Sequence, residues 1–286
     1  MLIRLIKLFI AIVSYTLYRS MVITFSLCKK ELPGTFVVLT YHSVKKHQLS
    51  QFARHMDEIL KRARPILADH ITPLENSQHH VAVTFDDGFQ SVLNNALPAM
   101  RKRKIPATIF VPTAYLGKKP GWIPNSTHVN ADEVVLTEEQ LRQLQDDLTI
   151  IGSHSDSHPK LTEISEDRVI KELINSKKAL EGILRTRIAL LSLPYGAYNE
   201  TILELSRKAG YDRIFRNIPT FNSSKIDEFL RGRVATSPDD WMVEYRLKLL
   251  GAYKWLPHAI SIKKKLQNLC RSFSRRNEGD NYETAS

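Results

Sequence analysis

Seven short stretches of β-branched or otherwise apolar residues recur through the middle of the chain, at 36–41, 81–85, 107–111, 149–152, 188–193, 211–215 and 229–235. Stretches of this length between polar or glycine-containing segments predict strands. Between most of them the apolar residues recur at helical spacing, as in 138–145, 166–184 and 199–209. The residue before the segment 166–184 is Ser165, which fits the N-cap of a helix.

Alternating strands and helices predict parallel βα units. Seven strands fit a closed barrel better than an open sheet, although the count alone leaves the open sheet as an alternative. In a parallel barrel the catalytic groups lie where strands end and loops begin. Motifs that carry chemistry should therefore follow the seven stretches directly.

The two ends of the chain differ from this body. Residues 8–18 and 20–28 are uncharged, with Arg19 between them, and together they are nearly long enough to span a bilayer. A central arginine costs roughly 2.5–3.5 kcal/mol on insertion, so an interfacial helix is the alternative. A cleaved signal peptide is less favoured because no clear small-x-small site follows. We therefore expect a membrane anchor or interfacial helix over residues 1–30.

The C-terminal segment 242–274 predicts a basic amphipathic helix, with apolar residues at helical spacing at Ile262, Leu266, Leu269 and Phe273. Such a helix binds a lipid surface or packs on the outside of the barrel. The polar tail 275–286 is expected to be disordered. With 286 residues, 43% of them apolar, the remaining residues 31–241 suffice for one barrel domain.

The net charge of +11 lies mostly at the ends of the chain. Residues 1–30 carry five basic side chains and no acidic one, and residues 242–286 carry nine basic and four acidic ones, so the body is nearly neutral. A nucleic-acid enzyme would place its basic stripe on the folded body. Basic ends beside a neutral body indicate a membrane surface instead. The two cysteines, Cys28 and Cys270, form no disulfide framework and leave the compartment open.

Two motifs directly follow predicted strands and carry acidic or imidazole side chains. Asp86 and Asp87 end the stretch 81–85 and precede a glycine, which suits one carboxylate for a metal and the other for a water, or else an ordinary turn. His154 and His158 follow the stretch 149–152 in a loop rich in serine. Two imidazoles and one carboxylate leave coordination positions for water and substrate, as a hydrolytic zinc site requires.

A third motif, Pro194-Tyr195-Gly196, ends the stretch 188–193. It forms a turn that could offer the Tyr195 amide to an oxyanion. The alternative is an ordinary strand-to-helix turn in which Asn199 caps the next helix.

Over residues 36–256 these motifs, in this order, resemble the polysaccharide deacetylase family, also known as the NodB-homology or carbohydrate esterase type four domain. The family has an irregular seven-stranded (β/α) barrel. Its Thr-Phe-Asp-Asp-Gly motif matches Thr84–Gly88 and its His-Ser/Thr-x-x-His-Pro motif matches residues 154–159. The resemblance implies that Asp86 is the catalytic base and that Asp87, His154 and His158 hold a divalent metal ion, for which zinc is the first expectation. The resemblance also implies a catalytic role for Tyr195 and a substrate-binding role for Pro194.

Two features depart from the family pattern. Many members carry an arginine before Pro-Tyr-Gly, where this chain has Leu193, and many supply the general acid from a late Leu-x-His, for which only His258 is available. In a permuted subgroup that deacetylates exopolysaccharide, a Tyr-His segment on the first strand supplies the general acid. The segment Tyr41-His42 resembles it. We favour His42, with a structural histidine as the alternative. Arg231 resembles an arginine of the same subgroup and is expected to replace the missing one.

The resemblance implies a hydrolase that removes N-acetyl groups from a glycan. Asp86 removes a proton from a metal-activated water, the metal and the Tyr195 amide stabilise the oxyanion, and protonated His42 donates to the departing amine. The alternatives are an esterase acting on another acetylated substrate and a degenerate barrel that binds glycan within a membrane assembly complex. We expect an acetylated glycan and a membrane surface as partners, no nucleic acid, and association with the bacterial inner membrane. The oligomeric state, the glycan and the side of the membrane stay open.

Overall fold

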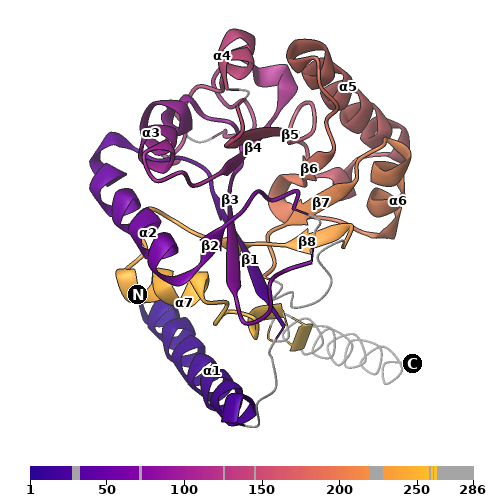
Figure 1. Ribbon diagram of the computed structural model, residues 1–286. Coiled ribbons are helices and arrows are strands. Elements are labelled where there is room, and N and C mark those ends of the chain that lie inside the picture. Colours follow the sequence, from indigo (N-terminus) through magenta and orange to yellow (C-terminus); the bar gives the residue numbers. More distant parts are fainter. Residues whose placement is uncertain are drawn as a thin grey trace, which may run out of the picture.

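The structure, a computed structural model, describes residues 1–27, 33–70, 73–124, 126–144, 146–219, 228–257, 259 and 261–262. A barrel of parallel strands lies at its centre, with helices around the outside (Figure 1). The strands run in the order β8-β7-β6-β5-β4-β3-β1-β9. Their bounds are β1 (Thr35–Tyr41), β3 (His79–Phe85), β4 (Ala107–Val111), β5 (Thr149–Ser153), β6 (Leu190–Ser192), β7 (Arg213–Arg216), β8 (Leu230–Gly232) and β9 (Val234–Ala235).

The barrel closes through one short segment of chain. β8 pairs with β7, and β9, which begins two residues after β8 ends, pairs with β1 at the other edge of the sheet. Residues 230–235 therefore join both edges, with Arg233 between the two half-strands. The seven predicted stretches all contain strands, so the predicted α/β barrel is confirmed. The prediction lacked β2 (Arg64–Pro65), a two-residue strand that pairs with β3 outside the main order.

The strands carry apolar side chains on both faces. One set packs inside the barrel, and the other packs between the sheet and the surrounding helices. The inner set comprises Phe36, Val38, Ala82, Phe110, Leu190 and Phe215, together with Ala68 from a loop. Near-continuous apolar strands arise because both faces of a parallel sheet are buried. This closed interior fixes the strand ends and hence the loops that follow them.

Six helices cover the barrel: α2 (Leu49–Arg62), α3 (Leu97–Arg101), α4 (Glu138–Gln143), α5 (Glu166–Leu184), α6 (Glu200–Lys208) and α7 (Met242–Leu249). The bounds of α5 agree with the predicted segment, although Ser165 occupies its N-cap without a side-chain hydrogen bond. Asn199 does cap α6, because its side chain accepts from the Ile202 amide at 2.9 Å. The turn after Pro194–Gly196 therefore leads into a helix capped by Asn199, which was one of the two alternatives for this motif.

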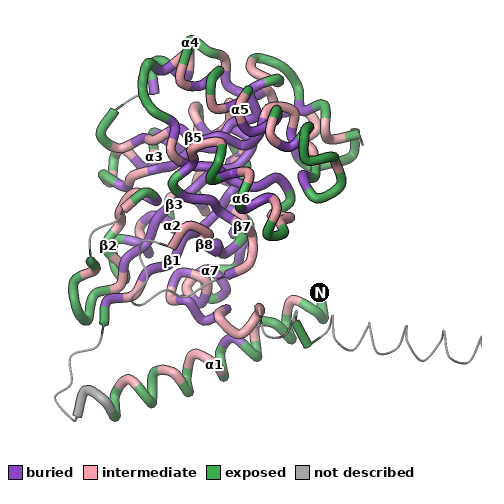
Figure 2. Tube along the Cα trace, turned by 90° about the vertical axis from the view of Figure 1, so that its right-hand side faces the viewer, coloured by how far each residue is buried: buried purple, intermediate pink, exposed green. Residues whose placement is uncertain are grey.

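The N-terminal helix α1 (Leu2–Leu27) lies outside the barrel and packs against α7 (Figures 1 and 2). Its segment Leu2–Thr24 has the length and hydropathy of a membrane span. The predicted C-terminal amphipathic segment begins with α7, but residues 263–286, and His258, lie outside the described part of the chain.

Candidate functional site

The acidic pair occupies a left-handed turn at the end of β3. Asp87 and Gly88 have φ values of 67° and 57°, so two successive residues adopt a conformation that side chains disfavour. A Cβ at Gly88 would lie 2.9 Å from a methyl group of Val111, so glycine is required there for space as well. The Asp86 amide donates to the carbonyl of Tyr41 at 2.9 Å and extends the pairing of β3 with β1. The turn directs the two carboxylates in different directions.

The loop that carries His154 and His158 follows β5 and is hydrogen-bonded to Glu172 of α5. Glu172 accepts hydrogen bonds from the amides of Asp156 at 3.1 Å and Ser157 at 2.7 Å. Within the loop, the His158 amide donates to the Ser155 hydroxyl at 3.1 Å. Glu172 therefore fixes the shape of the segment between the two imidazoles, a role that the sequence did not suggest.

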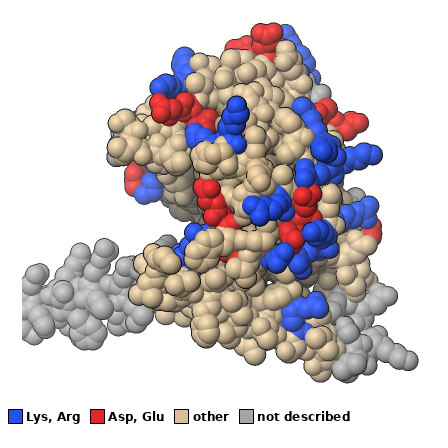
Figure 3. Space-filling view, turned by 90° about the vertical axis from the view of Figure 1, so that its left-hand side faces the viewer, with Lys and Arg blue, Asp and Glu red and all other residues tan. Residues whose placement is uncertain are grey.

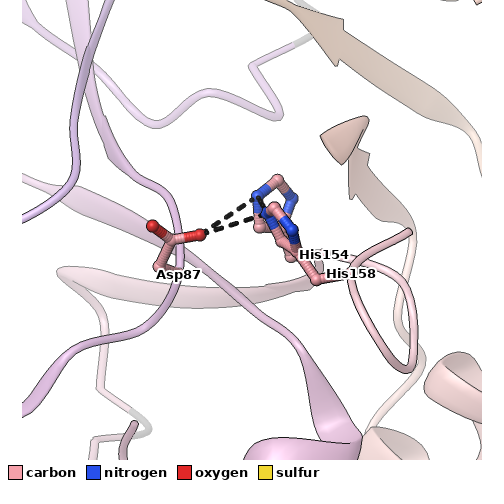
Figure 4. Close-up of side chains that lie close together, drawn as sticks. All are labelled: Asp87, His154 and His158. Atoms are coloured by element: carbon pink, nitrogen blue, oxygen red, sulfur yellow. Dashed lines mark hydrogen bonds and ion pairs between the residues drawn. The ribbon is translucent and has the colours of Figure 1, made fainter. Parts of the chain in front are cut away.

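Asp87, His154 and His158 converge from the ends of β3 and β5 (Figure 4). The Asp87 Oδ1 atom lies 3.5 Å from His154 Nε2 and 3.3 Å from His158 Nε2. The two Nε2 atoms are 3.2 Å apart, and one ligand atom from each residue lies within 4.8 Å of the others. All three side chains are buried. The three predicted metal ligands are thus brought together.

The hydrogen bonding of His154 tests whether this cluster suits a cation. Its Nδ1 lies 2.8 Å from the Ser192 carbonyl oxygen, which can only accept, so Nδ1 carries a proton. In the neutral ring, Nε2 then turns a lone pair toward Asp87 and His158. Burial opposes charge on this ring, yet Asp86 and Asp87 raise the pKa of His154 above its usual value. Lone pairs and carboxylates facing one point fit a divalent metal, with the carbonyl orienting the ligand.

Asp86 is a buried carboxylate paired with Arg233. Arg233 Nη1 donates to Oδ1 at 2.7 Å and Nη2 donates to Oδ2 at 2.6 Å. The same guanidinium donates to the Ser192 hydroxyl at 2.8 Å and to Asn217 Oδ1 at 2.6 Å. Burial acts to raise the pKa of Asp86, but the Arg233 charge holds it at about 2. Asp86 is therefore ionised and fixed in orientation, as a base must be.

Arg231, which the sequence favoured for this position, lies elsewhere. Its guanidinium stacks on Phe36, with the Cζ atom 4.9 Å from the ring centroid, and donates to the Ala68 carbonyl at 3.1 Å. Phe36 is at the start of β1, whereas Asp86 follows the end of β3. The structure therefore brings Arg233, not Arg231, to the site.

A cavity of about 320 Å³ opens over these groups. His42, directly after β1, and Tyr195 line it, and Tyr195 is 57% exposed. Pro194 is buried and is not among the lining residues of the described chain, so it shapes the turn that carries Tyr195. The remaining lining residues are Asp86, Asp87, Trp122, Ile123, Pro124, His128, Asn130, His154, His158 and Asn217.

Trp122 is a side chain of this cavity that the sequence did not single out. Its ring stacks on His158 with centroids 4.4 Å apart and planes at 21°, and Tyr195 meets the same imidazole edge-on at 5.0 Å. Among the described residues, His158 Nδ1 has no hydrogen-bond partner. His158 is thus oriented by aromatic packing, whereas His154 is oriented by a carbonyl.

Backbone strain also gathers at this cavity. Seven non-glycine residues of the described chain have positive φ, and four of them are Asp87, Ser155, His158 and Tyr195. Such conformations cost about 1–3 kcal/mol each and persist where the surroundings enforce them. Their concentration in three of the loops that line the cavity distinguishes this end of the barrel from the other.

The chain is similar to several known proteins. The family model described as polysaccharide deacetylase matches residues 74–214. A Bacillus subtilis (strain 168) protein named as a polysaccharide deacetylase, YxkH, is 27% identical over 73% of this chain and 74% of its own length. A poly-β-1,6-N-acetyl-D-glucosamine N-deacetylase of Staphylococcus aureus (strain MRSA252) is 30% identical over 46% of this chain and 45% of its own length.

Solved structures share the fold. IcaB from Ammonifex degensii superposes with a TM-score of 0.64 at 24% identity, covering 78% of this chain and all of the other. The Streptococcus pyogenes deacetylase PplD, in complex with acetate, gives a TM-score of 0.60 at 19% identity over 77% of this chain and 99% of the other.

Proposed function

The chain carries a polysaccharide deacetylase domain, and we propose that it is an active metal-dependent hydrolase that removes N-acetyl groups from a polysaccharide. The observation that carries this proposal is the cluster of Asp87, His154 and His158 beside the ion-paired Asp86. A divalent ion held by the three ligands, zinc in the first place, would polarise an acetyl carbonyl and activate a water.

In this proposal Asp86 is the base. Its carboxylate is ionised by Arg233 and adjoins the metal ligands, so it can take a proton from a water that attacks the acetyl carbon. Because both oxygens are engaged by Arg233, the carboxylate cannot rotate away. Tyr195, held in a left-handed conformation at the cavity wall, would offer its amide to the developing oxyanion.

The acid in this proposal is His42. It lines the same cavity as Asp86 and stands at the end of the neighbouring strand, since β1 pairs with β3. An amine leaves poorly unless it is protonated, so a donor is needed on the leaving-group side. His258, the other candidate, lies outside the described residues.

A glycan is the substrate that the site and the relatives support together. The cavity is at the low end of the range for small-molecule sites, about 300–1,000 Å³, which suits one sugar unit at a time. The Staphylococcus aureus relative is named for N-deacetylation of a polymer of N-acetylglucosamine. We place this chain in exopolysaccharide or cell-envelope glycan metabolism, at the bacterial inner membrane through α1.

The degenerate glycan-binding scaffold is less well supported, because its argument was the missing arginine at Leu193. Arg233 supplies a guanidinium to Asp86 from another strand. The choice of substrate distinguishes an esterase from an N-deacetylase, and the following experiment compares the two.

The test is acetate release from N-acetylglucosamine oligomers and from matched O-acetylated sugars, with zinc or cobalt and with chelator. We expect N-acetyl hydrolysis that the chelator abolishes and metal restores. Release from O-acetyl substrates alone would establish the esterase. Stoichiometric metal binding without any acetate release would support the scaffold.

A further inference from the structure

The helix α1 is divided lengthwise into a covered face and an exposed face. Its less exposed residues are mostly three or four positions apart, at Arg4, Leu8, Ala11, Ser14, Tyr15, Tyr18 and Val22. Such spacing places them on one side of a helix. Nearly all other apolar side chains of α1 are exposed; they include Leu5, Ile6, Phe9, Ile12, Val13, Leu17, Met21 and Ile23.

The covered face is docked on α7 and the turn that follows it. Arg4 Nε donates to Glu244 at 2.7 Å. Ala11, with 0% exposure, packs into a cluster with Leu247, Ala252 and Tyr253. Further along, the Lys254 ammonium lies 3.8 Å from the ring centroid of Tyr18. These contacts extend over residues 4–18, about 21 Å of helix at 1.5 Å per residue.

This docking site is at the opposite end of the barrel from the metal ligands. Tyr15 and Tyr18 line a hollow of about 130 Å³ together with Thr35 and His79, the first residues of β1 and β3. The functional groups follow the last residues of those same strands. Seven residues of strand separate the two ends by about 20 Å. Figure 2 shows α1 running across the lower end of the molecule.

We propose that α1 lies in the plane of a bilayer of anionic lipid, docked on the catalytic domain rather than crossing the membrane, so that the active site opens away from the lipid. A crossing helix would have to leave α7 or draw its ion pairs into hydrocarbon, because Arg4 also lies 3.9 Å from Asp240, a residue paired with Lys248. Buried charge is costly in hydrocarbon. The in-plane position keeps these contacts and places the exposed apolar side chains in lipid.

The charge of α1 selects lipid as the occupant of its exposed face. Lys7 and Arg19 are exposed, and the helix contains no acidic residue. Apolar side chains with flanking basic ones are the pattern of helices on anionic membranes. Figure 3 shows that the lower part of one side, where α1 lies, carries few charged side chains. A hollow of about 480 Å³ on α1 is lined by Ser14, Lys254 and otherwise apolar or aromatic side chains, which suits an acyl chain below an anionic headgroup.

The first experiment measures binding of the full-length protein to phosphatidylcholine vesicles with and without phosphatidylglycerol. We expect flotation with the anionic vesicles, and its loss in the variant Phe9→Glu/Val13→Glu. The matched control Val129→Glu adds a charge at an exposed apolar residue beside the active-site cavity, at the opposite end of the barrel from α1, and should still float. Failure of the wild type to float, or self-association through α1 in place of flotation, would overturn the proposal.

The second experiment distinguishes the in-plane helix from a spanning one. In a chain with Cys28→Ser and Cys270→Ser, single cysteines are placed at Leu2 and Val129 and labelled on sealed spheroplasts with a membrane-impermeant maleimide. Both are expected to react from the same side. Reaction from opposite sides would show a spanning helix, and loss of the Leu2 label would show cleavage; each result overturns the proposal while leaving the deacetylase activity untouched.

The third experiment measures orientation. A fluorophore at Gln78, which is exposed and lines the hollow beside α1, should be quenched by headgroup nitroxide lipid. A fluorophore at Val129, 70% exposed on the loop beside the active-site cavity, should not be. Quenching of the Val129 label equal to that of Gln78 would place the active site at the membrane and sink the orientation.

Discussion

Arg231 and Arg233 stand two residues apart in the segment that closes the barrel, and both side chains have 0% exposure, yet they serve opposite ends of its interior. Arg231 stacks on Phe36 at the start of β1, and Arg233 pairs with Asp86 beyond the end of β3. Side chains at i and i+2 of a strand share a face and are about 6.6 Å apart along it. A shift of two residues along the strand therefore separates Arg231, which packs on Phe36, from Arg233, which positions Asp86.

The first prediction compares Arg233→Lys with Arg231→Lys. Lysine cannot make the two parallel hydrogen bonds to Asp86, so Arg233→Lys should lower kcat at least tenfold while retaining the fold and the metal. Arg231→Lys is the matched control and should leave kcat within about twofold while lowering the melting temperature. An equal fall in kcat for both, measured by acetate release, would contradict the assignment.

The second prediction concerns the metal ligands. His154→Ala and Asp87→Ala should each lose most bound zinc, because a three-ligand site cannot spare one. A ligand that binds only the folded state stabilises it by about 2.7 kcal/mol at a hundredfold excess over Kd. Added zinc should therefore raise the melting temperature of the wild type and not of the variants. Full metal occupancy in both variants by elemental analysis would remove the assignment.

The third prediction concerns Trp122. Because His158 Nδ1 has no hydrogen-bond partner among the described residues, the stacked indole and the edge-on Tyr195 ring restrain the imidazole. Trp122→Ala should weaken zinc binding by about 10–100-fold, the usual effect of removing a group that orients a ligand. Trp122→Phe should recover part of it. Ile123→Ala, at the same cavity wall, is the control, and a zinc Kd equal in all three variants would count against the role.

The fourth prediction concerns proton transfer. Asp86→Asn and His42→Ala should each lose about 10²–10⁴-fold in kcat and still bind zinc. His128 lines the same cavity and serves as the control histidine. A His42→Ala enzyme near wild-type rate, with either His128→Ala or His258→Ala inactive, would move the acid to that residue.

The fifth prediction is a pH dependence of stability from His55. This residue of α2 is buried against Tyr245, with ring centroids 3.8 Å apart, and burial lowers its pKa to about 4. In the unfolded chain the His55 pKa returns to 6.5, so between pH 6.5 and 4 the unfolded chain binds a proton that the folded chain does not bind. Stability is therefore full above pH 6.5 and falls toward pH 4, by about 2 kcal/mol at pH 5.

Denaturant unfolding of the wild type and of His55→Phe between pH 4 and 8 measures this contribution. Phenylalanine retains a ring against Tyr245 and cannot be protonated. The free energy of unfolding of the wild type minus that of the variant should therefore decrease as pH falls. A difference independent of pH would mean that His55 is not the group involved.

Much of this architecture could be predicted from the sequence, because buried parallel strands are apolar on both faces and motifs at their ends are short and local. The proposed ligands Asp87, His154 and His158 lie in the segments that directly follow two such strands. Arg233 was missed because choosing between two arginines on one face requires the position of the strand in the barrel. That position depends on pairing with β1 and β7, which are far away in the sequence.

Trp122 was missed for a different reason. It lies between β4 and α4, where glycine and proline interrupt every periodic pattern. Its contact with His158 depends on how that loop folds back over the cavity. Asp86 and the histidines could be recognised from neighbouring residues, whereas Trp122 required the tertiary structure.

The place of Arg233 at the junction of β8 and β9 has a consequence for the newly made protein. During synthesis Asp86 leaves the ribosome well before residue 233, so the carboxylate is made long before the guanidinium that restrains it. Only when the last half-strand reaches β1 does the guanidinium arrive on Asp86. If Asp86 is the base, as proposed above, the new chain acquires an oriented base only when the circle of strands is complete.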